Sequence, residues 1–224
     1  MERGNFLGEP YRALLEIAVW VGLIEAYAWR LSKIPGVKSL TLLMLFVYMS
    51  FSLWRRRVTL KEMGIRGDTF WPAAKSMGLL AGLLIVLLLA TGTILGRSPW
   101  SRKFVLMLLG YVPWGTFQQF LLQSYLCVRL RAAFSEDFTP AVWSAFFFGV
   151  VHLPNPYLVV ASFAFGVIGC LHFLKYRNLW VLGLAHALLG SFIYHCFPAE
   201  IVGGFNTAEG YLKHFAPLFI GPGR

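Results

Sequence analysis

The sequence predicts an all-α fold, a polytopic membrane helical bundle of about seven transmembrane helices, or eight if the C-terminal tail adds one. Hydrophobic residues make up 58% of the 224 residues and charged residues only 13%, whereas a soluble domain carries about 25% charged residues. The apolar residues also gather in runs close to the ~20 residues that cross a bilayer. We therefore expect 1–224 to form a single integral membrane domain.

Seven apolar runs define the expected spans. The net charge of +10 sits in short basic clusters between these runs rather than along one face. Such clusters set membrane topology and contact lipid headgroups, so we expect no nucleic-acid partner. The expected spans are 12–31, 38–54, 76–95, 104–130, 139–153, 156–175 and 179–197.

The seven apolar runs differ in the residues that flank or interrupt them. The first starts near Arg12, has full membrane length and lacks a small-residue cleavage site, which favours a span over a signal peptide. The second and third runs flank the basic stretch 55–75, which fits either an interfacial amphipathic helix or an ordinary cytoplasmic loop. In the fourth run, Pro113 and Gly115 predict a kink. After the seventh run, 198–224 is a Gly-rich tail.

Polar side chains inside the later runs mark the candidate site. Gln118 and Gln119 lie in the middle of the fourth run, and Gln123 follows one turn later. His152 and His186 lie in the fifth and seventh runs. Because a bilayer core offers no water to replace lost hydration, such groups usually belong to a functional site. We expect these helices to converge on a polar cavity.

The pattern of these residues resembles the CAAX protease and bacteriocin-processing (CPBP, or Abi) family of intramembrane peptidases. The motifs of that family read Glu-Glu-x-x-x-Arg, Phe-x-x-x-His and His-x-x-x-Asn or Asp. Phe148 and His152 match the second motif, and His186 begins the third. The resemblance covers a family-like core at about 104–197.

Two motifs depart from the family pattern. Gln118, Gln119 and Gln123 stand where the family has Glu, Glu and Arg, and Gly190 stands in place of Asn. These replacements remove acids and base together, which avoids an unpaired buried ion.

The resemblance implies roles for these positions. In the family, the first Glu and the His of the second motif activate a water, and the later His and Asn stabilise the oxyanion. The family-equivalent catalytic positions here are Gln118, Gln119, Gln123, His152 and His186. A glutamine can hold a water but cannot take its proton, and loss of a general base costs about 10²–10⁴-fold in rate.

Other residues offer substitute chemistry. Glu25, in the first run, is a possible replacement base, although it also fits a partner for Arg30 or a residue at headgroup level. Cys127 or Cys196 would be a nucleophile only if a histidine lay beside it; together with Cys170 they show no zinc-binding spacing and are expected to be buried apolar residues. We expect no metal and no cofactor, because two histidines with amides are a poor ligand set.

Three functions follow from this pattern. The first is a CPBP-type intramembrane peptidase-like protein acting on a membrane-associated protein or lipidated peptide, in CAAX-type or leader and anchor processing. The second is a catalytically silent pseudoprotease that binds or protects a membrane partner. The third is a transporter, which no inverted repeat supports. Whether the chain is an enzyme depends on an acid within reach of His152. The resemblance places it in the cytoplasmic (plasma) membrane of a prokaryote.

Overall fold

Every regular element in the computed structural model is helical, and residues 8–34 and 36–213, which the structure describes, contain no strand. The predicted all-α class is therefore confirmed. The long elements are α1 (Gly8–Trp29), α2 (Val37–Arg55), α3 (Phe70–Ile94), α4 (Arg102–Gln119) continued by the π-helical η2 (Phe120–Cys127) and by α5 (Val128–Arg131), α6 (Phe138–Val150), α7 (Pro156–Tyr176) and α8 (Leu179–Cys196). The short ones are η1 (Leu31–Lys33), α9 (Ala199–Val202) and η3 (Gly203–Phe205).

Four of these helical segments are long and apolar enough to cross a membrane: 70–94, 102–131, 156–176 and 179–196. This is fewer than the seven or eight spans expected from the sequence. The difference has local causes, since α6 has only 13 residues and α1 carries Arg12, Glu16 and Glu25. Two boundaries also shift. The helix α3 begins at Phe70, within the basic stretch, and α6 ends before His152.

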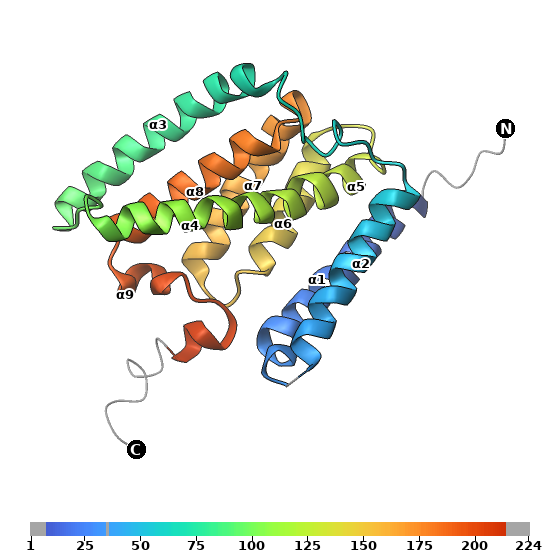
Figure 1. Ribbon diagram of the computed structural model, residues 1–224, viewed down its shortest axis with the longest axis horizontal. Coiled ribbons are helices and arrows are strands. Elements are labelled where there is room, and N and C mark those ends of the chain that lie inside the picture. Colours follow the sequence, from blue (N-terminus) through green and yellow to red (C-terminus); the bar gives the residue numbers. More distant parts are fainter. Residues whose placement is uncertain (1–7, 35, 214–224) are drawn as a thin grey trace.

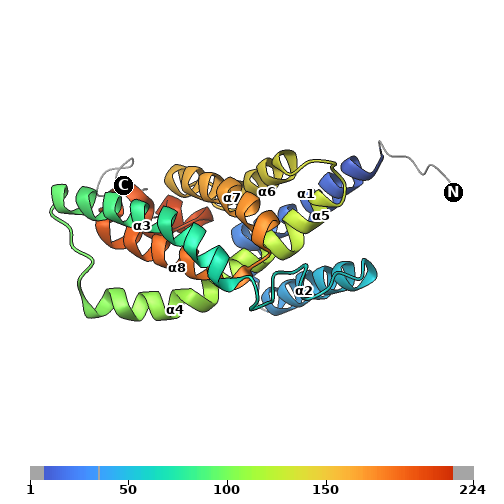
Figure 2. The ribbon, with the colours of Figure 1, turned by 90° about the horizontal axis from the view of Figure 1, so that it is seen from above.

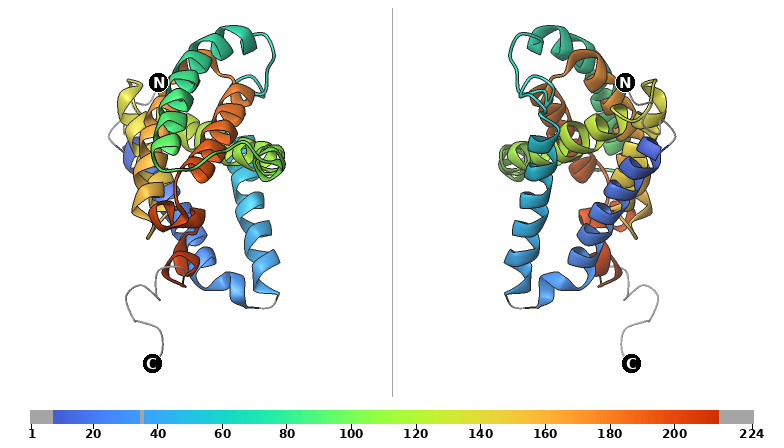
Figure 3. Two further views of the ribbon diagram at one scale, coloured as in Figure 1. Left: turned by 90° about the vertical axis from the view of Figure 1, so that its left-hand side faces the viewer. Right: turned by 90° about the vertical axis from the view of Figure 1, so that its right-hand side faces the viewer.

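The helices form two packed groups and a separate hairpin (Figure 1). Helix α8 packs against both α3 and α4, while α6 packs along α7. The helices α1 and α2 form the hairpin, which extends from the rest of the bundle (Figure 3). The α1 and α2 arms diverge, and the end of η2–α5 lies between them (Figure 2). Buried residues of all three segments, such as Ile17, Met49 and Leu130, form one apolar cluster.

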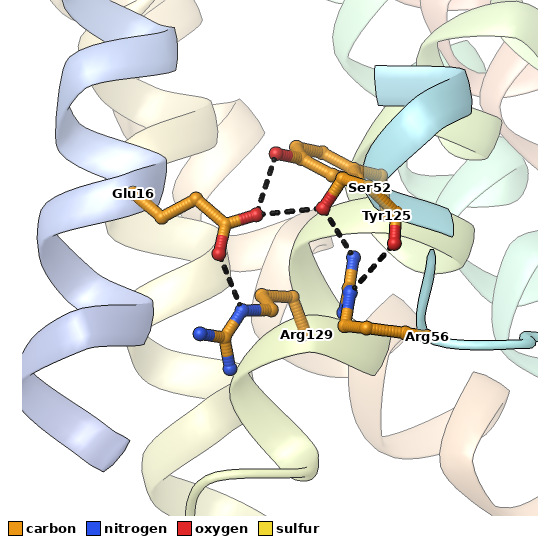
Figure 4. Close-up of polar contacts among 5 residues, drawn as sticks. All are labelled: Glu16, Ser52, Arg56, Tyr125 and Arg129. Carbon is orange, nitrogen blue, oxygen red and sulfur yellow. Dashed lines mark hydrogen bonds and ion pairs between the residues drawn. The ribbon is translucent and has the colours of Figure 1, made fainter. Parts of the chain in front are cut away.

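A partly buried polar cluster joins the hairpin to the bundle (Figure 4). Glu16 of α1 accepts hydrogen bonds from Arg129 Nε of α5 at 2.7 Å, from Ser52 Oγ of α2 at 2.8 Å and from the Tyr125 hydroxyl of η2 at 3.2 Å. Arg56 donates to Ser52 Oγ and to its carbonyl. The side chains of Arg129 and Glu16 are only 10% and 19% exposed, so this ion pair is largely desolvated.

The described part of the tail, up to residue 213, folds back onto the turn between α6 and α7. Asn155 caps α7 by accepting from the Leu158 amide, and its Nδ2 donates to the carbonyls of Val202 and Asn206. Farther along, Glu209 forms an ion pair with Lys33 next to the α1–α2 turn. The tail thereby closes one end of the bundle.

The packing of α8 against α4 depends on a glycine. A Cβ at Gly183 of α8 would lie 2.8 Å from Thr116 Cα and 2.3 Å from Thr116 Oγ1 of α4. Small residues allow this backbone approach, which supplies the van der Waals contact that stabilises helices in a membrane.

We predict that Gly183→Ala destabilises the fold by about 1–3 kcal/mol, because the new methyl group meets backbone and forces α4 and α8 apart. The matched control is Gly82→Ala in α3, where no atom lies within 4 Å of the added Cβ. That change should be neutral or slightly stabilising, since Ala favours helix over Gly. Thermal unfolding in detergent measures both, and equal midpoints for the two variants would contradict the packing argument.

We further predict that Arg129→Gln lowers stability by about 3–5 kcal/mol, because it leaves the Glu16 carboxylate without its charged partner. Arg131→Gln is the control, because Arg131 pairs with Asp137 at the surface, where the two side chains are 34% and 55% exposed. An exposed pair contributes only about 0–1 kcal/mol. Chemical unfolding of both variants tests this prediction, and a comparable loss at Arg131 would refute it.

Candidate functional site

A mainly apolar cavity of about 730 Å³ lies among the helices. Its walls come from α1, α3, α4, η2, the end of α6, α7 and α8, and the tail adds Phe205 and Thr207. The described residues that line it include no Asp, Glu, Lys or Arg. Its main polar side chains are Gln118, His152 and His186, which the sequence singled out, together with Tyr111, which it did not.

A chain of four hydrogen-bonded side chains forms one side of the site. Gln123 Nε2 donates to Gln119 Oε1 at 3.0 Å, as their four-residue spacing predicts. Gln119 Nε2 lies 3.0 Å from His186 Nδ1, and His186 Nε2 lies 3.3 Å from the Tyr111 hydroxyl. Gln119 and Gln123 are both fully buried. The structure therefore brings together α4, η2 and α8.

The direction of this chain follows from its chemistry. An amide nitrogen donates and does not accept, so Gln119 Nε2 donates to His186 Nδ1. His186 is then the neutral tautomer that carries its proton on Nε2, and it donates to the Tyr111 oxygen. Both ring nitrogens of His186 are thereby engaged, and no member of the chain carries a formal charge.

His152 lies in the turn after α6 and also lines the cavity. Its Nδ1 lies 2.7 Å from the Phe148 carbonyl oxygen, which only accepts, so Nδ1 carries the proton. The Phe148 ring packs edge-on against the imidazole at 5.0 Å. In the neutral imidazole, Nε2 of His152 is then a lone-pair acceptor, and the bond to Phe148 orients the ring.

Gln118 differs from the two glutamines that follow it. It lines the cavity, and its Oε1 is buried without a hydrogen-bonding partner among the described residues. Its position about 100° round the helix from Gln119 explains why it does not join the hydrogen-bonded chain. The segment is α-helical from Arg102 to Gln119, with Pro113 inside it, and becomes π-helical from Phe120.

Tyr111 occupies the space beside Gly190. A Cβ at Gly190 would lie 2.4 Å from Tyr111 Cε1 and 3.3 Å from its hydroxyl oxygen. A side chain at position 190 and the present Tyr111 rotamer therefore exclude each other. The Asn that the third family motif has at this position is absent, and a phenol hydroxyl beside His186 fills the same region.

The alternative chemical groups named from the sequence lie elsewhere. Glu25 accepts from Trp29 Nε1 at 3.0 Å on its own helix and is not among the cavity residues. Cys127, Cys170 and Cys196 are free and buried, as predicted, and none of them lines the cavity. Among the described residues, no group of three or more His, Cys, Asp or Glu side chains is arranged to hold a metal ion.

Fold and site together define an α-helical integral membrane protein with an uncharged Gln–His–Tyr site facing an apolar cavity. A family model described as type II CAAX prenyl endopeptidase Rce1-like matches residues 99–192, which is less than half of the chain. This match contains all the glutamine and histidine site positions and confirms the resemblance to the CPBP family. No curated protein and no solved structure matches the chain.

Sequence reasoning missed two contributors to the site and its surroundings. Tyr111 carried no motif signal, because its role depends on the neighbouring helix α8. The pairing of Glu16 with Arg129 joins residues 113 positions apart. One signal was present in the sequence, since Glu16 is an acid inside an apolar run and such a group needs a partner.

We predict that Gly190→Asn destabilises the protein by about 1–3 kcal/mol, because the new side chain overlaps the Tyr111 ring. Tyr111→Ala should relieve that overlap. The double variant Tyr111→Ala/Gly190→Asn should therefore lose less unfolding free energy than the two single variants lose together, by about 1 kcal/mol or more. Gly110→Asn is the control, since nothing lies within 4 Å of a Cβ there. A double-mutant cycle of unfolding free energies tests this, and strict additivity would argue against the steric pairing.

Proposed function

We propose that this chain is a CAAX-type intramembrane protease-like protein that binds a lipidated, membrane-associated peptide without hydrolysing it at an enzymatic rate. Its general role rests on the match to the Rce1-like family. The finer statement, binding without cleavage, rests on the chemistry of the site.

One observation carries the proposal: the described residues that line the cavity include no Asp, Glu, Lys or Arg, and His186 has both nitrogens engaged. Hydrolysis of an amide needs a base to take a proton from water and donors to stabilise the oxyanion. Gln118 supplies only an amide at the position where hydrolysis needs an acid. The carboxylate of Glu25 accepts a hydrogen bond from Trp29. A neutral site of this kind can hold an uncharged peptide group, but it activates water poorly.

The volume and the lining of the cavity also suit the proposed ligand, a lipidated peptide. Its volume of about 730 Å³ lies within the ~300–1,000 Å³ range of small-molecule sites. Residues such as Leu84, Leu121 and Ile168 supply apolar walls for a prenyl or acyl chain. Polar groups of Tyr111 and Gln119 lie within hydrogen-bonding distance of His186. A ligand with one long apolar group and one peptide group fits this division.

A specific observation favours a second candidate, slow peptidase activity. His152 keeps the Nε2 lone pair on the cavity wall and is oriented by the Phe148 carbonyl. It would act as a general base alone, without the acid of the family motif. The expected penalty of about 10²–10⁴-fold in rate makes this the weaker proposal.

We also propose that the membrane crossings include α1 and α2 besides the four segments that are long and apolar enough to cross a membrane. Helix α1 has 22 residues, which at 1.5 Å per residue is about 33 Å and matches a ~30 Å hydrocarbon core. Helix α2 has 19 residues, close to the same requirement. We place the protein in the cytoplasmic membrane of a prokaryote.

We predict that the protein in nanodiscs binds a fluorescent S-farnesyl-cysteine peptide more tightly than the same peptide without the lipid, and releases no cleaved product above background. His152→Ala should leave that background unchanged, because no hydrolysis depends on it. The control variant is His195→Ala: His195 makes the same kind of bond to the carbonyl four residues earlier but does not line the cavity.

Fluorescence anisotropy and mass spectrometry of the peptide decide among the outcomes. Equal affinity for the lipidated and unlipidated peptides would refute the binding proposal. Cleavage that His152→Ala abolishes and His195→Ala preserves would replace it with the slow peptidase.

A further inference from the structure

A second cavity, of about 420 Å³, lies at one end of the bundle, and no described residue lines both it and the apolar cavity. Four of its lining residues carry charge: Arg131, Arg177, Glu62 and Asp137. They come from the end of α5, the residue after α7, the loop before α3 and the residue before α6. These segments meet at the same end of the molecule (Figure 1). The volume lies within the ~300–1,000 Å³ range of small-molecule sites.

The four charged side chains are accessible to a ligand. The side chains of Arg131 and Asp137 are 34% and 55% exposed. Glu62 is exposed and Arg177 is half-buried. A molecule in this cavity can therefore reach charged groups without displacing the packed core.

Each arginine has more donors than its bonds within the protein use. Arg131 donates through Nε to Asp137 and through Nη1 to the Phe134 carbonyl. Arg177 donates through Nη1 to the Glu62 carbonyl at 3.3 Å. A guanidinium carries five N–H donors in a planar fork, which is a geometry that binds phosphate. The bonds within the protein therefore orient both guanidinium groups and leave N–H groups for an anion.

The two carboxylates can still bind a cation. Glu62 accepts from the Thr59 amide at 2.7 Å and from the Thr59 hydroxyl at 2.8 Å, both through Oε2. These bonds lower the pKa of Glu62, so the group is ionised at neutral pH. Asp137 accepts from Arg131 through Oδ1. Within the described structure, hydrogen bonds thus engage one oxygen of each carboxylate.

The position of this cavity indicates a lipid ligand. Two of the segments that are long and apolar enough to cross a membrane end here, 102–131 at Arg131 and 156–176 directly before Arg177. The ends of membrane spans lie at the level of the lipid headgroups. Val128 and Leu174 add apolar side chains to the lining, which suits the glycerol and the first methylenes of a lipid.

The combination of charges selects among headgroups. A headgroup with a phosphate alone would meet two carboxylates as well as two arginines, and like charges brought together cost affinity. A zwitterionic headgroup offers a phosphate to Arg131 and Arg177 and an ammonium to Glu62 and Asp137. The ammonium of phosphatidylethanolamine has three N–H donors, as a lysine ammonium does. The trimethylammonium of phosphatidylcholine has none.

We propose that this second cavity is a binding site for the headgroup of phosphatidylethanolamine, in which Arg131 and Arg177 bind the phosphate and Glu62 and Asp137 bind the ammonium. The site goes beyond the proposed function, because it shares no lining residue with the apolar cavity and needs no peptide. A bound lipid would join the ends of α5 and α7 to the loop before α3 and so stabilise this end of the bundle.

The test is native mass spectrometry of the full-length protein in detergent, titrated with dioleoyl-phosphatidylethanolamine or dioleoyl-phosphatidylcholine. The two lipids have the same chains and the same phosphate, so a difference in affinity comes from the ammonium group. Wild-type protein should bind phosphatidylethanolamine about 3- to 10-fold more tightly, the range expected for one net hydrogen bond. Equal affinity for the two lipids would overturn the proposal. Tighter binding of dioleoyl-phosphatidylglycerol would also overturn it, because that result would define a site for anionic lipids.

The two halves of the site should respond differently to substitution. Arg131→Gln and Arg177→Gln should each weaken both lipids by a similar factor of about 3 to 10, because both lipids contain the phosphate. The double variant Glu62→Gln/Asp137→Asn loses both negative charges and should remove the preference for phosphatidylethanolamine. Unchanged affinities in the two arginine variants, or a preference that survives the double variant, would contradict the proposal.

Two charged residues outside the cavity provide matched controls. Arg97 is exposed and lies just beyond the end of another apolar segment, 70–94, so Arg97→Gln should change neither affinity. Glu136 is exposed and accepts from the Thr139 amide, much as Glu62 accepts from an amide. Glu136→Gln should keep the preference for phosphatidylethanolamine. Effects of the control variants as large as those of the cavity variants would reduce the result to general surface charge and reject the site.

Photocrosslinking of wild-type protein covers the case in which a variant does not fold. A phosphatidylethanolamine with a diazirine beside its headgroup should label peptides that contain 128–137 and 174–177. Labelling confined to other peptides would overturn the site. Soluble glycerophosphoethanolamine carries the same charges and should suppress the label only at far higher concentration than the lipid. Equal suppression would assign the cavity to a soluble ligand and reject the lipid.

Discussion

Polar side chains in this protein lie among apolar helices, and the need to pair them without water shapes both the fold and the site. The protein meets this need in two ways. At the junction of α1, α2 and α5, a carboxylate and a guanidinium pair at 2.7 Å with a serine and a tyrosine beside them. At the cavity, Gln123, Gln119, His186 and Tyr111 are linked by hydrogen bonds without any charge, and the Oε1 atoms of Gln118 and Gln123 stay without a partner among the described residues. Without these partners, burial of either set of polar groups would cost several kcal/mol.

The two polar networks meet in the π-helical segment η2. Gln123 and Tyr125 both belong to it, one bonded toward the cavity side through Gln119 and the other toward Glu16. Segments of π-helix often occur at functional sites, where the widened backbone redirects side chains. Here the segment sends neighbouring residues to a neutral network and to an ionic one. Glu16 and Arg129 are not among the cavity residues, and the described lining of the cavity carries no Asp, Glu, Lys or Arg.

The neutral site is consistent as a unit. Replacing acids and arginine by glutamines changes the first motif, and the matched pair of Gly190 and Tyr111 changes the region of the third. The Gln119 amide fixes the tautomer of His186, and the Tyr111 hydroxyl accepts from the other ring nitrogen. Gln119 therefore fits its neighbours on both sides, whereas the Oε1 atoms of Gln118 and Gln123 have no hydrogen-bonding partner among the described residues. The described lining of the cavity is uncharged.

The sequence by itself determined the all-α class, the order of the helices and the four-residue spacing of Gln119 and Gln123, because these depend on local hydropathy and helical periodicity. It also identified Gln118, His152 and His186, since polar residues stand out in apolar runs. Only the tertiary structure decided that Tyr111 meets His186, that Trp20 faces the same cavity as Gln118, and that Glu16 pairs with Arg129. Those contacts depend on how each helix is rotated and packed against another, and a one-dimensional pattern of hydropathy does not encode the rotation.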